Sequence, residues 1–291
     1  MRHIKTYQVF EASASAALTA EQKIWLDECA RGTWKLNRQT GLVDVDGNFK
    51  CEYQSLQDFK GVKFGKVSEN FYCNNNQLTS LVGAPEKVVG FFWGMDNQLT
   101  TLKGAPHSVG SVFYCHRNQL TTLVGAPHSV GKSFECCDNA LTSLEGAPRN
   151  VGERFNCSHN QLTSLVGAPQ SVGDDFKCNN NQLTSLVGAP KTVGGYFCCN
   201  DNQLTTLVGA PQIVRTNFFC SDNPVSEKTL KTIFNKMKQG TSYLAAVESL
   251  WSGIPQYDQA LLYADDFKWV SPEQSRGIIA LRAYHDLRGM L

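Results

Sequence analysis

A strict 21-residue repeat constrains the fold of this chain more than any other feature. Asparagines recur every 21 residues, and leucines follow the first seven of them at two and five residues. Gly-Ala-Pro also recurs seven times, from Gly83 to Pro211. The asparagines are Asn76, Asn97, Asn118, Asn139, Asn160, Asn181, Asn202 and Asn223. One such repeat cannot bury its apolar side alone, so the repeats must stack into a solenoid.

The second part of each repeat predicts a β-strand. A valine, a phenylalanine and usually a cysteine follow Gly-Ala-Pro, as in Val109, Phe113 and Cys115. The phenylalanine and the cysteine are two residues apart, so they face the same side of a strand, toward the core. The pattern extends back to Val45 and predicts nine rungs, about 4.8 Å apart. We expect each asparagine amide to satisfy backbone groups in its loop.

The order Phe-x-Cys-x-x-Asn-x-Leu-x-x-Leu resembles the leucine-rich repeat. The fuller form, Asn-Gln-Leu-Thr-Ser-Leu-x-Gly-Ala-Pro, is similar to repeat proteins of tailed phages and some bacteria. The resemblance covers about residues 45–223. It implies an α/β repeat solenoid with a parallel β-sheet on a concave face. It says little about function, because repeat folds serve many tasks.

Both ends of the repeat array have sequences that fit caps. Thr19-Ala20-Glu21-Gln22 is a capping box, and the helix that it opens is expected to run to Gly32, with Ile24, Trp25 and Cys29 on one face. A hairpin over residues 34–45 follows. Beyond the solenoid we expect helices, the last opened by Ser271-Pro272. The predicted organisation is a leader (1–18), an N-terminal cap (19–44), the solenoid (45–223) and a helical C-terminal cap or docking domain (224–291).

The first residues carry a second resemblance. The segment Lys5-Thr6-Tyr7-Gln8 is similar to the start of targeting segments on internal head proteins of large contractile-tailed phages. In those segments a phage protease cuts after a glutamate, and Val9-Phe10-Glu11 loosely fits, with valine in place of the usual leucine or isoleucine. The resemblance implies a packaged or structural virion component. The alternative is a leader that packs on the cap.

Eleven cysteines offer candidate chemistry. One inward cysteine per rung cannot surround a metal ion, so the column is expected to be reduced, buried and unreactive. Cys137 and Cys198 break the pattern and should face solvent. Cys137 stacks beside His116, which suggests an activated thiolate or, with Asp138 and His159, a zinc site. An enzyme that uses this Cys–His site is an alternative hypothesis, whereas the binding hypothesis expects no catalytic residue, no metal and no cofactor. The cysteine column consists of Cys51, Cys73, Cys115, Cys136, Cys157, Cys178, Cys199 and Cys220, with Gly94 interrupting it.

The outward residues of the sheet give the strongest functional signal. Rungs three to five are expected to present a contiguous exposed aromatic cluster, whereas later rungs are polar and charged. Exposed apolar patches mark interaction sites, in which Trp, Tyr, Met and Arg are enriched. The alternative is that the aromatic rings merely stabilise the sheet. The predicted partner-binding residues are Tyr72, Phe91, Trp93, Met95, Val112, Tyr114, His116 and Arg117.

Taken together, the sequence predicts a non-catalytic protein-binding module that captures a host or viral protein. The formal net charge of +1 gives no general attraction to nucleic acid or anionic lipid, and no apolar stretch is long enough to span a membrane. We therefore expect no nucleic-acid or membrane partner. The expected location is the cytoplasm of the host cell, or the virion if the leader is a targeting signal.

Overall fold

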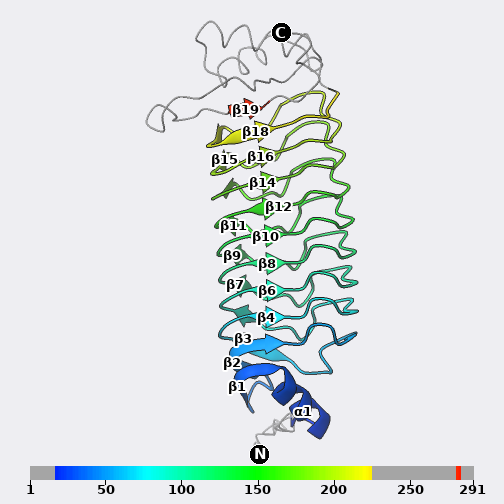
Figure 1. Ribbon diagram of the computed structural model, residues 1–291, viewed down its shortest axis with the longest axis vertical. Coiled ribbons are helices and arrows are strands. Elements are labelled where there is room, and N and C mark those ends of the chain that lie inside the picture. The colour runs from blue at the N-terminus through cyan, green and yellow to red at the C-terminus, as the bar shows by residue number, and fades with distance from the viewer. Residues whose placement is uncertain (1–16, 225–279, 283–291) are drawn as a thin grey trace, which may run out of the picture.

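The computed structural model describes residues 17–224 and 280–282, and it is a parallel β-solenoid. Each rung contributes two short strands, and the rungs stack into a column (Figure 1). The repetitive sequence favours this stacking because the side chain at each position of a rung contacts an identical or similar side chain in the rungs above and below. The predicted stacking of the 21-residue repeats into a solenoid of parallel strands is confirmed.

The N-terminal cap is one helix followed by a hairpin. Helix α1 (Ala20–Cys29) begins at the predicted capping box, in which Gln22 N donates to Thr19 Oγ1 and Thr19 N donates to Gln22 Oε1. The helix ends three residues before Gly32, because β1 (Ala30–Leu36) starts there and pairs antiparallel with β2 (Val43–Lys50). The described part of the predicted leader includes Leu18, which packs against the core.

The prediction for one residue of the apolar helix face was wrong. Ile24 is 58% exposed, whereas Leu26 is fully buried beside Trp25. The indole of Trp25 lies edge-on to Phe49, with ring centroids 5.3 Å apart. The helix therefore covers the first rung with Trp25, Leu26 and Cys29.

Two parallel ladders build the column, and β2 starts both. It pairs with β3 through Val43 and with β4 through Phe49. The front ladder consists of β4 (Phe71–Tyr72), β6 (Phe92–Trp93), β8 (Phe113–Tyr114), β10 (Phe134–Glu135), β12 (Phe155–Asn156), β14 (Phe176–Lys177), β16 (Phe197–Cys198) and β18 (Asn217–Phe219). The back ladder consists of β3 (Phe64–Val67), β5 (Lys87–Val88), β7 (Ser108–Val109), β9 (Ser129–Val130), β11 (Asn150–Val151), β13 (Ser171–Val172), β15 (Thr192–Val193) and β17 (Ile213–Val214).

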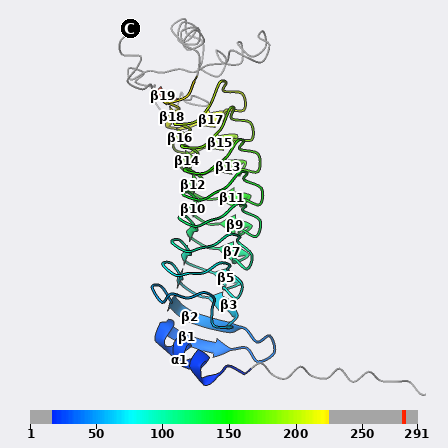
Figure 2. The ribbon, with the colours of Figure 1, turned by 90° about the vertical axis from the view of Figure 1, so that its right-hand side faces the viewer.

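The shape of the column corrects one expectation. Figures 1 and 2 show a nearly straight stack, so the sheet does not form the predicted concave face. The reason is that strands lie on both sides of each rung, and both ladders rise by one strand spacing. A bend would need a wider element, such as a helix, on one side. We call the outward surface of the front ladder the front face.

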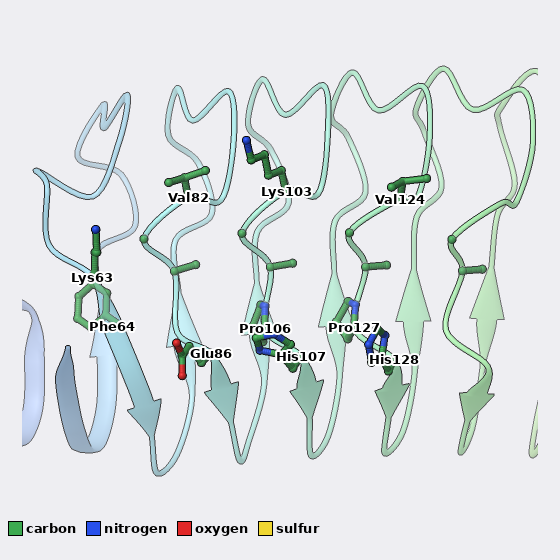
Figure 3. A pocket seen from close by; sticks show the side chains of 18 of the residues that line it. Lys63, Phe64, Val82, Glu86, Lys103, Pro106, His107, Val124, Pro127 and His128 are labelled. Atoms are coloured by element: carbon green, nitrogen blue, oxygen red, sulfur yellow. The ribbon is translucent and has the colours of Figure 1, made fainter. Parts of the chain in front are cut away.

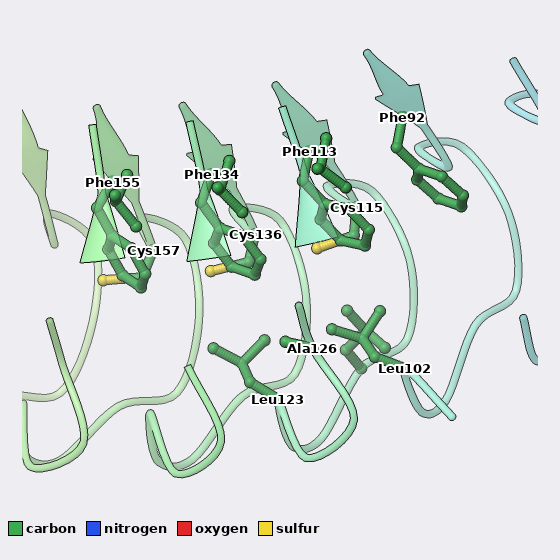
Figure 4. Packing of buried hydrophobic residues seen from close by; sticks show 14 of the residues in the cluster. Phe92, Leu102, Phe113, Cys115, Leu123, Ala126, Phe134, Cys136, Phe155 and Cys157 are labelled. Carbon is green, nitrogen blue, oxygen red and sulfur yellow. The ribbon is translucent and has the colours of Figure 1, made fainter. Parts of the chain in front are cut away.

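The core consists of the predicted apolar columns. Phenylalanines from Phe49 to Phe218 stack ring on ring, with centroids 4.9–5.5 Å apart. The column cysteines lie beside them, and Figure 4 shows this for Cys115, Cys136 and Cys157. Several of these thiols donate to a carbonyl of the next rung, as Cys136 Sγ does to Asn156 O (3.3 Å). The inward cysteine assignment is confirmed, as is the interruption at Gly94.

The asparagine column ties successive rungs together, as predicted. Asn160 Nδ2 donates to the carbonyls of Cys136, Cys157 and Ser158, each at 3.1 Å. Its Oδ1 accepts from the backbone N–H of Leu141 in the preceding rung. Each residue before these asparagines has a positive φ, as His159 does (52°). This tight turn aims the amide back into the column, so one side chain satisfies several otherwise unpaired backbone groups.

Beyond the last rung, three residues of the predicted helical cap are described. Ala280–Arg282 form β19, which pairs in parallel with β18. The helices expected over the rest of residues 225–291 lie outside the described residues, as does the phage-like segment around Lys5-Thr6-Tyr7-Gln8. No helix in the described ranges is long and apolar enough to cross a membrane.

Candidate functional site

The predicted partner-binding residues lie together on three neighbouring rungs of the front face. We call them the aromatic stripe. Tyr72, Trp93 and Tyr114 occupy the same register position of β4, β6 and β8, so the three side chains are consecutive in the ladder. The other stripe residues flank these strands in the chain. They are Phe91, Met95, Val112, His116 and Arg117.

Ring contacts hold the stripe in a defined geometry. Trp93 lies edge-on to Tyr72, with ring centroids 4.9 Å apart, and nearly parallel to Phe91 at 6.4 Å. On its other side it stacks on Tyr114 at 6.1 Å. Tyr114 then contacts the imidazole of His116 at 5.5 Å. Trp93 is therefore the centre of a continuous ring network, and each such aromatic pair adds about 0.5–1.5 kcal/mol of stability.

Mutual stacking reduces the exposure of the stripe below the prediction. Its apolar and aromatic members are half-buried rather than fully exposed, and Arg117, at 66% side-chain exposure, is the most open side chain. Arg117 lies 3.8 Å from Asp96 at the edge of the stripe. At the other end, Lys50 Nζ lies 5.2 Å from the ring centre of Tyr72. The stripe is thus an apolar, aromatic surface flanked by cations.

Several buried polar atoms without hydrogen-bond partners share one repeat position, and two of them lie on rungs of the stripe. In the described part of the chain, five side chains carry such an atom, and Glu52, Asn74, His116 and Asn200 all directly follow a column cysteine. His116 Nδ1 and Asn74 Oδ1 belong to rungs of the stripe itself. Burial lowers the pKa of His116, which favours the neutral imidazole. Unsatisfied buried polar groups cost free energy and are uncommon in proteins. Their recurrence at the position directly after the column cysteine is therefore unusual.

The next rungs carry charges where the stripe carries rings. Glu135 and Asp175 are buried, although the sequence placed them on an exposed polar surface. Arg154 Nε lies 3.3 Å from Asp175 Oδ2, and Lys177 Nζ lies 3.7 Å from the same oxygen. Asn156 Nδ2 donates to Glu135 Oε2 at 2.8 Å. We call Glu135, Arg154, Asp175 and Lys177 the charged cluster, and its charges are largely neutralised within the molecule.

Burial governs the titration of both acidic groups at this boundary. It raises the pKa of Glu135, and the hydrogen bond from Asn156 and the charge of Arg154 partly oppose the rise. Burial also raises the pKa of the Tyr114 phenol, and the nearby Glu135 carboxylate adds to that effect. The boundary between the stripe and the charged cluster is therefore a region of low effective polarity.

The Cys137–His116 pair lacks the electrostatics of a reactive thiol. Cys137 and Cys198 are partly exposed, as predicted, unlike the buried column members. Burial raises the pKa of Cys137 to about 12, helped by Asp138, and raises that of Cys198 to about 11. Both thiols are therefore protonated near neutral pH, whereas catalytic cysteines need a lowered pKa. In residues 17–224 and 280–282, no three His, Cys, Asp or Glu side chains lie close enough to hold a metal ion.

Two features of the structure were not predicted from the sequence. The burial of Glu135 and Asp175 was missed, although Glu135, Arg154, Asp175 and Lys177 fall near the same repeat position on consecutive rungs. That alternation of charge signs was the available signal. A groove along the Gly-Ala-Pro turns was also missed, although three small or flat residues recurring together predict a hollow.

No model of a protein family matches the chain, and no curated protein matches it either.

Proposed function

We propose that this chain is a non-catalytic binding protein of the leucine-rich-repeat type found in phages, which captures a host or viral protein on its aromatic stripe. The observation that carries the proposal is the position of Trp93. It stands at the centre of a half-exposed ring network that spans three rungs of the front face, whereas the other ring contact on that face joins only Tyr196 and Phe219. Half-exposed Trp and Tyr with a neighbouring Arg are the typical anchors of protein interfaces.

Within residues 17–224, the partly exposed thiols Cys137 and Cys198 are not activated nucleophiles, which favours the binding proposal over the Cys–His enzyme. The thiols nearest the stripe have raised pKa values, and His116 has a lowered one. A Cys–His pair with both groups neutral does not generate a thiolate. A partner covering the stripe would instead gain the desolvation of rings already held in place, with little loss of side-chain entropy.

A packaged virion component remains the second candidate, and it rests on the Lys5-Thr6-Tyr7-Gln8 segment. The two proposals imply different locations, the host cytoplasm or the virion. Quantitative proteomics of purified particles distinguishes them. A protein present in particles and shortened after Glu11 supports the virion role, whereas its restriction to the cell supports the cytoplasmic one.

The binding proposal is tested by affinity purification from host cells with three baits: the unchanged chain, Trp93→Ala and Lys177→Ala. We expect a protein that the unchanged chain and Lys177→Ala both retain and that Trp93→Ala loses. Lys177 is the matched control because it occupies the same register position on the front ladder. Equal recovery with all three baits would contradict the proposal.

A further inference from the structure

A groove of about 770 Å³ runs along the flank of the column where the Gly-Ala-Pro turns stack (Figure 3). Its lining extends over six rungs, from that of Leu42 to that of Arg149. It is formed by the turns between the leucines and the back ladder, a part of each rung other than the front strands that carry the aromatic stripe.

The repeated turn explains why the flank is hollow. Gly104 has a φ of +89°, and a Cβ there would lie 2.4 Å from the carbonyl oxygen of Leu81, so a side chain is excluded. Ala105 adds only a methyl group, and Pro106 is buried. Because the same three residues recur in each rung, the positions with the least side-chain volume line up along the column.

Two rows of exposed side chains form the walls. The residue before each glycine supplies one wall, with Val82, Lys103 and Val124 in successive rungs (Figure 3). The residue after each proline supplies the other, with Glu86, His107, His128 and Arg149. Val82 and Val124 are more than half exposed, which is unusual for valine and leaves apolar surface facing the groove.

The groove is positively charged. Lys63, Lys103 and Arg149 line it, against the single carboxylate of Glu86. Within the described residues none of these four side chains makes an ion pair, whereas Lys132 and Lys177 each have an acidic partner. The chain as a whole carries a net charge of +1, so this local excess of cations is not a general property of the surface. It favours an anionic occupant.

The cations are spaced regularly. Lys63, Lys103 and Arg149 belong to every second rung, and the rungs between them carry Val82 and Val124. Two rungs rise by about 9.6 Å, which is the separation of these cations along the column axis; Lys103 and Arg149 also lie on opposite walls. A polyproline II helix advances about 9.3 Å per three residues, so acids at every third position would stay level with the cation-bearing rungs and would meet cations from the two walls. Glu86, on a rung between two cations, disfavours an acid there.

We propose that this groove binds an extended peptide segment in the polyproline II conformation, with an acidic residue at every third position. The alanine floor and the exposed valines suit the apolar residues between the acids. Single-stranded nucleic acid is a poorer match, because it needs a row of aromatic rings for base stacking and more closely spaced cations. This site is independent of the stripe and of the function proposed for it.

Fluorescence anisotropy of a labelled (Glu-Pro-Pro)4 peptide with the full chain tests the proposal. We expect saturable binding that weakens at least about tenfold in the Lys103→Glu/Arg149→Glu double variant, since charge reversal replaces two attractions with repulsions. Lys191→Glu is the matched control, because Lys191 has the repeat position of Arg149 but lies beyond the groove, and it should change affinity less than about twofold. A peptide of the same composition with its glutamates adjacent should bind at least about fivefold more weakly.

Several results would overturn the proposal. One is the lack of saturable binding up to about 1 mM peptide. Another is an equal loss with Lys191→Glu, which would indicate unspecific attraction. Tighter binding of an oligothymidine would assign the groove to nucleic acid. Circular dichroism establishes that the variants are folded, and Trp93→Ala should leave peptide binding unchanged, so failure here is distinguishable from failure of the stripe.

Discussion

The aromatic stripe and the charged cluster occupy consecutive rungs of one ladder and share the same backbone register. In the stripe, Trp93 pairs with Tyr114; three rungs later, Asn156 pairs with Lys177 at the same position. The rings of the stripe contact one another and leave part of their faces exposed. The acids of the charged cluster are buried and meet Arg154 and Lys177.

This difference shows that inward and outward positions have different roles in the solenoid. Inward positions repeat because every rung must fill the same core, and a change there would break a column. Outward positions carry the rings of the stripe on three rungs, neutralised charges on the next three, and the Tyr196–Phe219 ring pair near the last rung, all on an unchanged backbone. The fold therefore does not require Trp93, and the charged cluster, with its charges already paired, offers a partner less free energy of binding than the stripe.

The largest expected effect is on thiol labelling. Column members such as Cys157 and Cys178 react only when the column opens, so a thiol reagent should label Cys137 and Cys198 faster by about three orders of magnitude or more. Mass spectrometry of partly labelled native protein measures both rates. Rapid labelling of Cys157 would refute the inward register.

The next effect compares an inward and an outward neighbour. Leu162 is fully buried, and Leu162→Ala should lower the free energy of unfolding by about 2–5 kcal/mol. Gln161 is exposed, and Gln161→Ala should change it by about 0.5 kcal/mol or less. Urea unfolding followed by circular dichroism gives both values. Equal losses would mean that the outward position also carries the fold.

A smaller effect on stability is expected to distinguish the aromatic stripe from the charged cluster. Trp93→Ala removes ring contacts with Tyr72, Phe91 and Tyr114, and should cost about 1–2 kcal/mol of stability. Lys177→Ala leaves Arg154 on Asp175, and should cost about 0.5 kcal/mol or less. The same unfolding experiment applies. A loss above about 4 kcal/mol for Trp93→Ala would make the stripe part of the core.

The smallest effect is a pH dependence in the charged cluster. The pKa of Glu135 is raised in the folded chain above its ordinary value of 4.5. The folded state thus binds this proton more tightly, so the contribution of Glu135 to stability is present below pH 4.5 and is lost as pH rises through the folded pKa. Glu135→Gln should remove this decline, and melting temperatures of both proteins across the acidic range test it. Parallel profiles for the two proteins would contradict the assigned shift.

The sequence was informative about the inward positions because they are periodic. The Phe, Cys, Leu and Asn columns and the capping box at Thr19 follow from spacing alone. The flat front face did not, because curvature depends on the relative widths of the two sides, and the second ladder through Val88 and its equivalents was not anticipated. The burial of Glu135 and Asp175 was equally hidden, since it depends on Arg154 reaching across rungs.

The most direct test of the central claim is the affinity of the purified partner for three forms of the chain, measured by isothermal titration calorimetry. Trp93→Ala should weaken binding by at least about 2 kcal/mol, the size expected of a central anchor. Lys177→Ala, at the same register position in the charged cluster, should have an effect within about 0.5 kcal/mol. An affinity that ignores Trp93 and Tyr114 but falls when the segment after Pro224 is changed would contradict the account and place binding beyond the solenoid.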